Sequence, residues 1–186
     1  MNIAFIIYDG MTALDFIGVY DAVTRLKTMG FRQDIQWDIC AYTPQVKDGS
    51  GLIFAPTKVG TSLQNYDLVI VPGGFSTREL VNNENFIAWL KTATPCQLKA
   101  SVCTGSLLWG KASFLAGKQA TTHPMAYDDL KPYCASVVDQ RVVDSGDIIT
   151  TRGVTSSIDL GLYLCEKFAG HEVKERIRKQ MDYQTS

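Results

Sequence analysis

Short apolar runs alternate with segments of helical period along the chain, and this alternation constrains the fold more than any other feature. Runs such as residues 2–8, 67–71 and 97–102 have the length of buried strands and are too short to span a bilayer. Amphipathic segments such as residues 14–29 lie between them. Alternating strands and helices imply parallel crossovers. We therefore predict an α/β fold with a single doubly wound, mostly parallel sheet and helices on both faces.

The same pattern continues to the end of the chain. Further strands are expected at residues 35–43, 52–55, 118–122, 138–143 and 147–151, and further helices at 84–93, 104–115, 155–169 and 171–181. No internal repeat, low-complexity segment or linker interrupts this order. At 186 residues the chain is long enough to bury a sizeable core, so residues 1–186 are predicted to form one domain.

Composition argues against several classes of function. The net charge is -1 and the sequence has no run of five basic residues, so we expect neither nucleic acid nor a membrane as a partner. The five cysteines are an odd number without a CxxC pair, which argues against a disulfide framework and a structural metal site. The N-terminus has no basic leader or cleavage site, so a cytoplasmic location is predicted.

Three loops carry the chemistry that this fold would place together. They comprise residues 8–15, 72–76 and 103–106, and each follows one of the predicted core strands. Doubly wound sheets form their sites where loops leave the carboxyl ends of central strands. If these three strands are neighbours, the loops converge on one site.

Cys103 is the candidate nucleophile. The sequence Ser101-Val102-Cys103-Thr104-Gly105 has small residues on both sides of the cysteine, as in the sharp strand-to-helix elbow that exposes a nucleophile. A helix starting at residue 104 would stabilise the thiolate and lower the pKa of the Cys103 thiol. The alternative interpretation is a buried cysteine that only packs in the core.

Other residues of these loops are candidates for supporting roles. The N–H groups of Gly73, Gly74 and Thr104 would form an oxyanion pocket beside the cysteine. Asp15 opens the first helix, where it serves either as a cap or as an acid–base partner of the thiol. His123 follows a short strand and would approach the site, although a structural role explains it equally well.

The motifs resemble the ThiJ/PfpI superfamily and, within it, the isonitrile hydratases. The resemblance rests on segments 14–18, 71–74, 101–107, 120–123, 153–155, 158–162 and 180–183, which span nearly the whole chain. It implies a flavodoxin-like fold similar to class I glutamine amidotransferases. No histidine follows Cys103 directly, however, and none lies in 150–160, so a Cys-His-Glu triad is not expected.

The resemblance implies a reaction and roles for the site residues. Cys103 would attack an isonitrile, Asp15 would act as acid and base, and Gly73 or Gly74 with Thr104 would line the oxyanion site. Water would be added to give an N-substituted formamide, without a metal or organic cofactor. The family is typically dimeric, so the expected partners are a small-molecule substrate and a second copy of the chain.

Two features resemble a different branch of the superfamily, the parkinsonism-associated deglycases. Arg152 stands where the hydratases have glycine, and it would narrow the pocket or bind an anionic group. The run Thr121-Thr122-His123-Pro124 also matches that branch. The alternatives are therefore a glyoxalase or deglycase that acts on reactive carbonyls, and a redox sensor in which Cys103 is oxidised without turnover.

Overall fold

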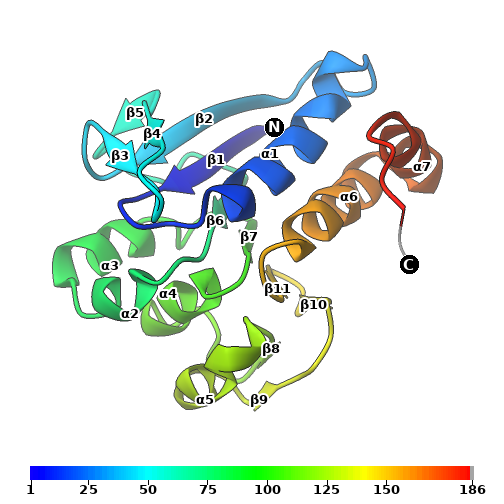
Figure 1. Cartoon of the computed structure of the whole chain (residues 1–186). Coiled ribbons are helices and arrows are strands. Elements are labelled where there is room, and N and C mark those ends of the chain that lie inside the picture. The colour runs from blue at the N-terminus through cyan, green and yellow to red at the C-terminus, as the bar shows by residue number, and fades with distance from the viewer. Residues whose placement is uncertain (185–186) are drawn as a thin grey trace.

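The computed structural model describes residues 1–184, which form a central sheet of seven strands covered by helices (Figure 1). The strand order is β10-β11-β7-β6-β1-β2-β5. The bounds are β10 Val142–Asp144, β11 Ile148–Thr151, β7 Leu98–Ser101, β6 Leu68–Val71, β1 Asn2–Ile7, β2 Gln36–Ala41 and β5 Lys58–Val59. All neighbours are parallel except β10 and β11. The predicted doubly wound, mostly parallel sheet is confirmed.

The order of the strands reverses between β1 and β6. From β1 the chain moves outward to β2 on one side, whereas β6, β7 and β11 follow one another on the other side. Right-handed crossovers in opposite directions place their helices on opposite faces of the sheet. In folds of this type, ligands bind at the carboxyl ends of the strands beside such a reversal.

Two groups of helices cover the sheet (Figure 1). Helix α1 (Ala13–Thr28) packs along α6 (Ser156–Ala169), and α7 (His171–Gln180) packs on both. The other group contains α2 (Thr77–Leu80), α3 (Glu84–Lys91), α4 (Gly105–Lys111) and α5 (Tyr127–Leu130). Helix α1 buries the predicted apolar stripe, Phe16, Val19, Val23 and Leu26. Packing of this stripe fixes the helix, and with it the position of Asp15 in its first turn.

Several predicted boundaries were wrong. The strand expected at 138–143 starts only at Val142, and the one expected at 118–122 shrinks to β8 (Gln119–Ala120), which pairs with β9 (Ser136–Val137) outside the main sheet. The elbow helix ends at Lys111 rather than near residue 115, because Ser113 adopts a left-handed φ of 72°.

Some short elements were not predicted at all. They are β3 (Val46–Lys47), which pairs with β4 (Ile53–Phe54), the edge strand β5, helices α2 and α5, β9, and the 3-10 turns Pro124–Ala126 and Lys131–Tyr133. Elements of two to four residues are too short to show a period in the sequence.

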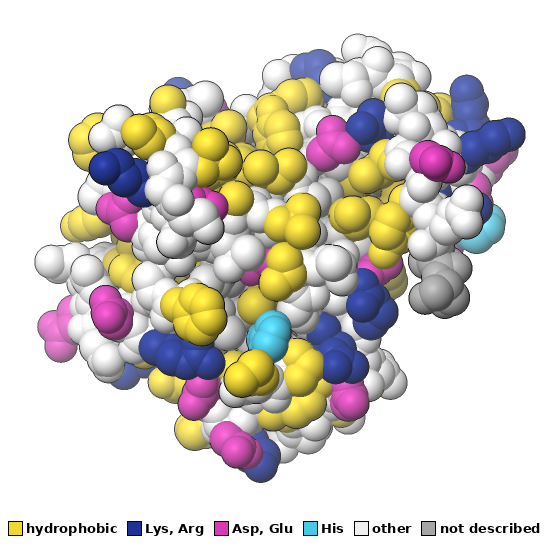
Figure 2. Space-filling view, in the orientation of Figure 1, with side chains coloured by type: hydrophobic (Ala, Val, Ile, Leu, Met, Phe, Trp, Pro, Cys, Tyr) yellow, Lys and Arg dark blue, Asp and Glu magenta, His cyan; other side chains and the backbone are white. Residues whose placement is uncertain are grey.

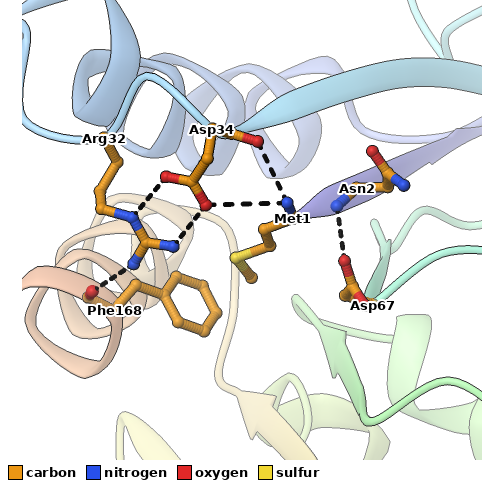
Figure 3. Close-up of polar contacts among 6 residues, drawn as sticks. All are labelled: Met1, Asn2, Arg32, Asp34, Asp67 and Phe168. Carbon is orange, nitrogen blue, oxygen red and sulfur yellow. Dashed lines mark hydrogen bonds and ion pairs between the residues drawn. The ribbon is translucent and has the colours of Figure 1, made fainter.

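Polar contacts anchor the amino end of the sheet (Figure 3). The N-terminal ammonium of Met1 donates to the carbonyl oxygen of Asp34 at 3.1 Å, and the N–H of Asn2 donates to Asp67 Oδ2 at 2.7 Å. Arg32 pairs with Asp34 and also donates to the carbonyl oxygen of Phe168 at 2.7 Å, which ties the end of α6 to this edge. These contacts fix β1 relative to β2, β6 and α6.

The described residues also show the state of the cysteines, the grouping of possible metal ligands and the character of the helices. All five cysteines are free thiols. Within residues 1–184, no group of three or more His, Cys, Asp or Glu side chains is arranged to hold a metal ion. None of the described helices is long and apolar enough to cross a membrane.

Candidate active site

The three loops singled out in the sequence meet at the carboxyl edge of the sheet. Their strands β1, β6 and β7 are adjacent in the sheet, which is the condition under which the loops were expected to converge. Val71 pairs in register with Ser101, so the residues that follow each strand leave the sheet at the same level. The loop after β6 therefore lies between the loop that carries Asp15 and the elbow that carries Cys103.

Cys103 occupies a strained elbow between β7 and α4. Its φ is 56°, a left-handed value that costs a residue with a Cβ of order 1–3 kcal/mol. Hydrogen bonds hold it there. Its N–H donates to the carbonyl oxygens of Thr151 (3.1 Å) and Arg152 (3.0 Å), and its carbonyl oxygen accepts from the hydroxyls of Thr122 (2.9 Å) and Ser106 (3.2 Å). The predicted elbow is confirmed, and four groups support it.

Gly73 is the point where the three loops touch. A Cβ built on Gly73 would lie 2.6 Å from the nitrogen of Thr104, 2.8 Å from Asp15 Oδ2 and 2.8 Å from the Cβ of Cys103. Real Cβ atoms do not approach neighbours this closely, so only glycine fits at this position. Its missing side chain is what lets the carboxylate and the thiol approach each other.

Asp15 is a buried partner of the site and not a helix cap. It is the third residue of α1, whose N-cap is Thr12, and its side chain has 0% exposure. Asp15 Oδ2 accepts a hydrogen bond of 2.9 Å from the N–H of Gly73, a residue of a different loop. Asp15 Oδ1 is buried and has no partner among the described residues. Asp15 is therefore not the N-cap of α1 and makes no capping hydrogen bond, although its place in the first turn also suits compensation of the helix dipole.

Burial raises the pKa of Asp15 to about 7. Hydrogen bonds from the Gly73 N–H and from the Cys103 thiol act in the opposite direction and favour the carboxylate. A carboxyl group that titrates near neutral pH is suited to exchange protons with a substrate.

The pKa of the Cys103 thiol is raised, not lowered as the helix N-terminus had suggested. Burial and the negative charge of Asp15 raise it to about 12, while hydrogen bonds from Thr104 and from the N–H of Val154 act in the opposite direction. Helix α4 has only seven residues, and the thiol is 5% exposed. A short helix cannot offset both the loss of water and a neighbouring carboxylate.

The two groups consequently hold one proton between them over a wide pH range. Between about pH 7 and pH 12 the carboxyl of Asp15 is ionised and the thiol of Cys103 keeps its proton. The buried Cys40 and Cys165 thiols also have raised pKa values, about 11 and about 12, but neither adjoins a buried carboxylate. Besides burial, the charge of Asp38 also raises the pKa of Cys40, but Asp38 is only partly buried and accepts a hydrogen bond from Tyr66. What distinguishes Cys103 is a fully buried carboxylate beside it.

The predicted oxyanion residues surround the site, but their N–H groups are partly engaged. The N–H of Gly73 donates to Asp15, and the N–H of Gly74 donates to the Thr104 hydroxyl at 3.0 Å. The N–H groups of Thr104 and Val154 face the sulfur of Cys103. The oxyanion role of the two glycines stays a prediction and would require their N–H groups to exchange partners.

His123 and Arg152 lie beside the elbow without reaching Asp15 or the thiol through a hydrogen bond. Nδ1 of His123 accepts from the N–H of Met125 at 3.2 Å, which caps the turn that follows, and its ring packs against Gly153. The guanidinium of Arg152 forms an ion pair with Asp139. A structural role accounts for the histidine contacts, and the charge of Arg152 is already partnered.

Val154 and Thr122 were missed by sequence reasoning about single residues. Both follow short strands, β11 and β8, whose ends lie next to the elbow. Only the order of the strands could have predicted the place of Val154. Because β11 pairs in parallel with β7, the loop after β11 lies next to Cys103. No feature of a lone valine or threonine indicates that role.

An open cleft of about 450 Å³ borders the loop after β6. Its walls include Met11, Thr12, Gly49, Phe75 and Ser76. Phe75, directly after Gly74, is 90% exposed, which is unusual for an aromatic side chain of this size. Asp15 and Cys103 do not line this cleft, which adjoins the loop between them through Phe75 and Ser76.

Comparison with known proteins finds relatives of one family along nearly the whole chain. Residues 1–167 match the DJ-1/PfpI family. Over 186 residues the chain is 32% identical to isonitrile hydratase of Pseudomonas putida, which covers 98% of this chain and 78% of that protein. It is 27% identical over 121 residues to the glutathione-independent glyoxalase DJ-1 of Schizosaccharomyces pombe, covering 63% of each. The crystal structure of a ThiJ/PfpI family protein from Pseudomonas syringae superposes with a TM-score of 0.89 at 28% identity, covering 100% of this chain and 76% of that one.

Neutralising Asp15 should lower the pKa of the Cys103 thiol. In Asp15→Asn the negative charge that raises this pKa is gone, so the thiolate forms at a lower pH. We expect the ultraviolet absorbance of the Cys103 thiolate to rise at a lower pH than in the wild type, with Cys103→Ala protein as the blank for the other cysteines. Asp21→Asn, which removes a carboxylate that pairs with Arg25 on the same helix, should leave this titration unchanged. An unchanged or higher pKa of the thiol in Asp15→Asn would contradict the coupling.

Proposed function

The chain belongs to the DJ-1/PfpI family, and on that premise we propose that it is a cysteine-dependent hydro-lyase that converts isonitriles to N-substituted formamides. One observation carries the proposal. A buried carboxyl of pKa about 7 shares a proton with an elbow cysteine across a glycine that admits no side chain. Similarity to isonitrile hydratase over nearly the whole chain supports the choice of substrate.

The first step forms a bond between sulfur and the terminal carbon of the isonitrile. Asp15 takes the proton of the Cys103 thiol as the sulfur attacks, and then delivers that proton to the same carbon. The product is a thioimidate in which the former terminal carbon carries one hydrogen, the sulfur and a double bond to nitrogen. Asp15 needs to be ionised at the start of this step. Because its pKa is about 7, the carboxyl is ionised above that pH.

The second step adds water and releases the cysteine. Asp15 accepts a proton from water as the oxygen attacks the thioimidate carbon, and passes it to the nitrogen. The tetrahedral intermediate then collapses. Its carbon–sulfur bond breaks, its hydroxyl becomes the formamide carbonyl, and the hydroxyl proton returns to the pair of Cys103 and Asp15. The N–H groups of Thr104 and Val154 face the sulfur and stabilise the negative charge that develops on it.

The organic group of the isonitrile is proposed to lie in the cleft beside the loop after β6. The exposed Phe75 gives this cleft one apolar wall beside the acidic Asp48 and Glu79, and its volume of about 450 Å³ suits a small organic substituent. No ion pair or cofactor is needed to hold an uncharged substrate there. The proposed partner is thus a small neutral molecule.

A second candidate is glyoxalase activity on reactive carbonyl compounds. The similarity to the glyoxalase of Schizosaccharomyces pombe favours it. The same thiol and carboxyl would serve, since attack on an aldehyde carbon also needs a base for the thiol proton. Turnover of methylglyoxal in place of an isonitrile would support this candidate.

We further propose that the chain acts as a homodimer. Leu14 and Ile17 on α1 are 41% and 40% exposed, and Leu52 and Ile53 near β4 are 53% and 56% exposed. Phe16 and Phe54 meet edge-to-face with ring centroids 5.7 Å apart, so these segments are neighbours. Figure 2 shows hydrophobic side chains gathered over this part of the surface. A contiguous apolar surface next to the site fits a second copy of the chain.

Turnover should depend on both members of the proton-sharing pair. We expect Cys103→Ala to abolish hydration of an isonitrile, and Asp15→Asn to lower kcat by about 10²–10⁴-fold, the usual effect of losing a general acid or base. The value of kcat/KM in the wild type should fall as the pH drops below about 7, because protonated Asp15 cannot accept the thiol proton. Formamide production followed by chromatography would measure all three.

Asp21→Asn serves as the control and should keep wild-type rates, and thermal melts of each variant separate chemical effects from unfolding. Wild-type activity in folded Asp15→Asn would refute its role. A protein that consumes no isonitrile or methylglyoxal, while Cys103 becomes oxidised, would be a redox sensor instead.

Replacing Ile17 by Glu should convert the dimer to a monomer, because the buried charge would have no partner in the interface. Light scattering at micromolar concentration gives the mass directly. Met125→Glu, which changes an 85% exposed side chain on a different segment, should remain dimeric. A monomeric wild type would count against the assembly.

A further inference from the structure

Tyr8 is buried beside the candidate catalytic pair, and no step of the proposed reaction uses it. It follows β1 directly and is 4% exposed. Its hydroxyl donates a short hydrogen bond of 2.6 Å to the carbonyl oxygen of Pro72. Burial and the charges of Asp15 and Cys103 raise the pKa of Tyr8 well above its ordinary value. The hydroxyl therefore stays protonated and acts as a donor at every pH at which the protein would work.

The acceptor of this hydrogen bond belongs to the peptide unit that also binds Asp15. The carbonyl of Pro72 and the N–H of Gly73 are the two ends of one amide, and they point in opposite directions across it. The N–H of Gly73 donates to Asp15 Oδ2 at 2.9 Å. One chain of hydrogen bonds thus runs from the Tyr8 hydroxyl through the peptide to the Asp15 carboxylate.

Hydrogen bonds in such a chain strengthen one another. A donor to the carbonyl oxygen draws electron density from the amide and makes its N–H a better donor, by an estimated 10–30% per bond. The low polarity around Asp15 makes this effect larger than it would be in water. The better the N–H donor, the more the carboxylate form of Asp15 is favoured over the acid form.

We propose that Tyr8 is a positioning residue that sets the proton affinity of Asp15 through the Pro72–Gly73 peptide. It touches neither sulfur nor carboxylate with a hydrogen bond, and it acts on the site through the backbone alone. The link to catalysis rests on the proposed function, whereas the link to the ionisation of Asp15 does not.

The hydroxyl can be separated from the packing of the ring. The ring of Tyr8 meets Phe86 edge-on, with centroids 5.8 Å apart and an interplanar angle of 76°. Phenylalanine at position 8 would keep this contact and remove only the oxygen. The substitution Tyr8→Phe therefore tests the hydrogen bond itself.

Few other ionisable groups lie close enough to Asp15 to change its pKa in the Tyr8→Phe variant. Cys103 faces Asp15 from the elbow, and Tyr8 faces it from the end of β1. Helix α6, which packs on α1, places the non-titrating Ser157 against Gly18, and its nearest acid, Asp159, points to Arg141 and Tyr183 instead. A change in the pKa of Asp15 in the Tyr8→Phe variant would thus originate in the peptide and its two partners.

The direct test is a titration of Asp15 by NMR in protein labelled with ¹³C at the aspartate carboxyl carbons. The Asp15→Asn variant identifies the signal by its loss. We expect Tyr8→Phe to raise the pKa of Asp15 by about 0.5, a roughly threefold change in its dissociation constant, because the carboxylate loses part of its stabilisation. The acid limb of kcat/KM for isonitrile hydration should move to higher pH by the same amount.

Tyr66→Phe is the matched control. Tyr66 also donates a hydrogen bond, to the partly buried Asp38 Oδ2 at 2.8 Å, but it precedes β6 at the opposite end of the strand from Pro72. Its loss should leave the Asp15 titration unchanged while changing stability to a similar degree. An effect of equal size in both variants would overturn the proposal, because it would reflect general loosening.

The outcomes of the two measurements are distinct. An unchanged Asp15 titration in Tyr8→Phe overturns the role of Tyr8 whatever the substrate proves to be. A raised pKa without any isonitrile turnover in the wild type supports the role and refutes only the proposed reaction. If Tyr8→Phe fails to fold, 3-fluorotyrosine placed at position 8 is a stronger donor and should lower the pKa of Asp15. A raised or unchanged pKa with fluorotyrosine would contradict the relay.

Discussion

The close packing of the Gly73–Gly74 loop between its two neighbours is the constraint on which the rest of the site depends. Its first N–H binds Asp15, the Gly73 carbonyl oxygen accepts from the N–H of Thr12 at 2.8 Å, and the Gly74 N–H binds the Thr104 hydroxyl. Two of these hydrogen bonds join the loop to the segment after β1, and the third joins it to the elbow after β7. The bonds form only because neither glycine has a side chain to hold the loops apart, and Gly74 also has a φ of 149°.

This packing has an electrostatic consequence. By excluding water, the loop raises the pKa of both the carboxyl and the thiol, so a single proton is shared between them. A thiol of raised pKa is a poor nucleophile in isolation, and the adjacent carboxylate supplies the missing base. The strain of Cys103 is compatible with a stable fold because the core strands and the contacts at the amino edge of the sheet hold β1, β6 and β7 in register.

Much of this arrangement could be predicted from the sequence, and the failures have definite physical causes. The period of the apolar residues gave the doubly wound sheet, and the small residues around Cys103 gave the elbow. The pKa of Cys103 was mispredicted because burial and the distance to Asp15 are tertiary properties. The role of Asp15 was ambiguous for the same reason, since capping and catalysis require the same residue type at the start of a helix. Tyr8 and Val154 act through backbone groups that no side-chain pattern reveals.

The most direct test of the site is the capture of a covalent bond between Cys103 and its substrate. When wild-type protein is mixed with an isonitrile, quenched within one turnover and reduced with borohydride, a thioimidate would become an aminomethyl thioether, in which a methylene carbon joins the sulfur to the amine nitrogen. Peptide mass spectrometry should then find the whole isonitrile plus two hydrogens on Cys103, and Cys103→Ala should carry none. Formamide release with no adduct at Cys103, or with an adduct at another cysteine, would contradict the assignment of Cys103 as the nucleophile.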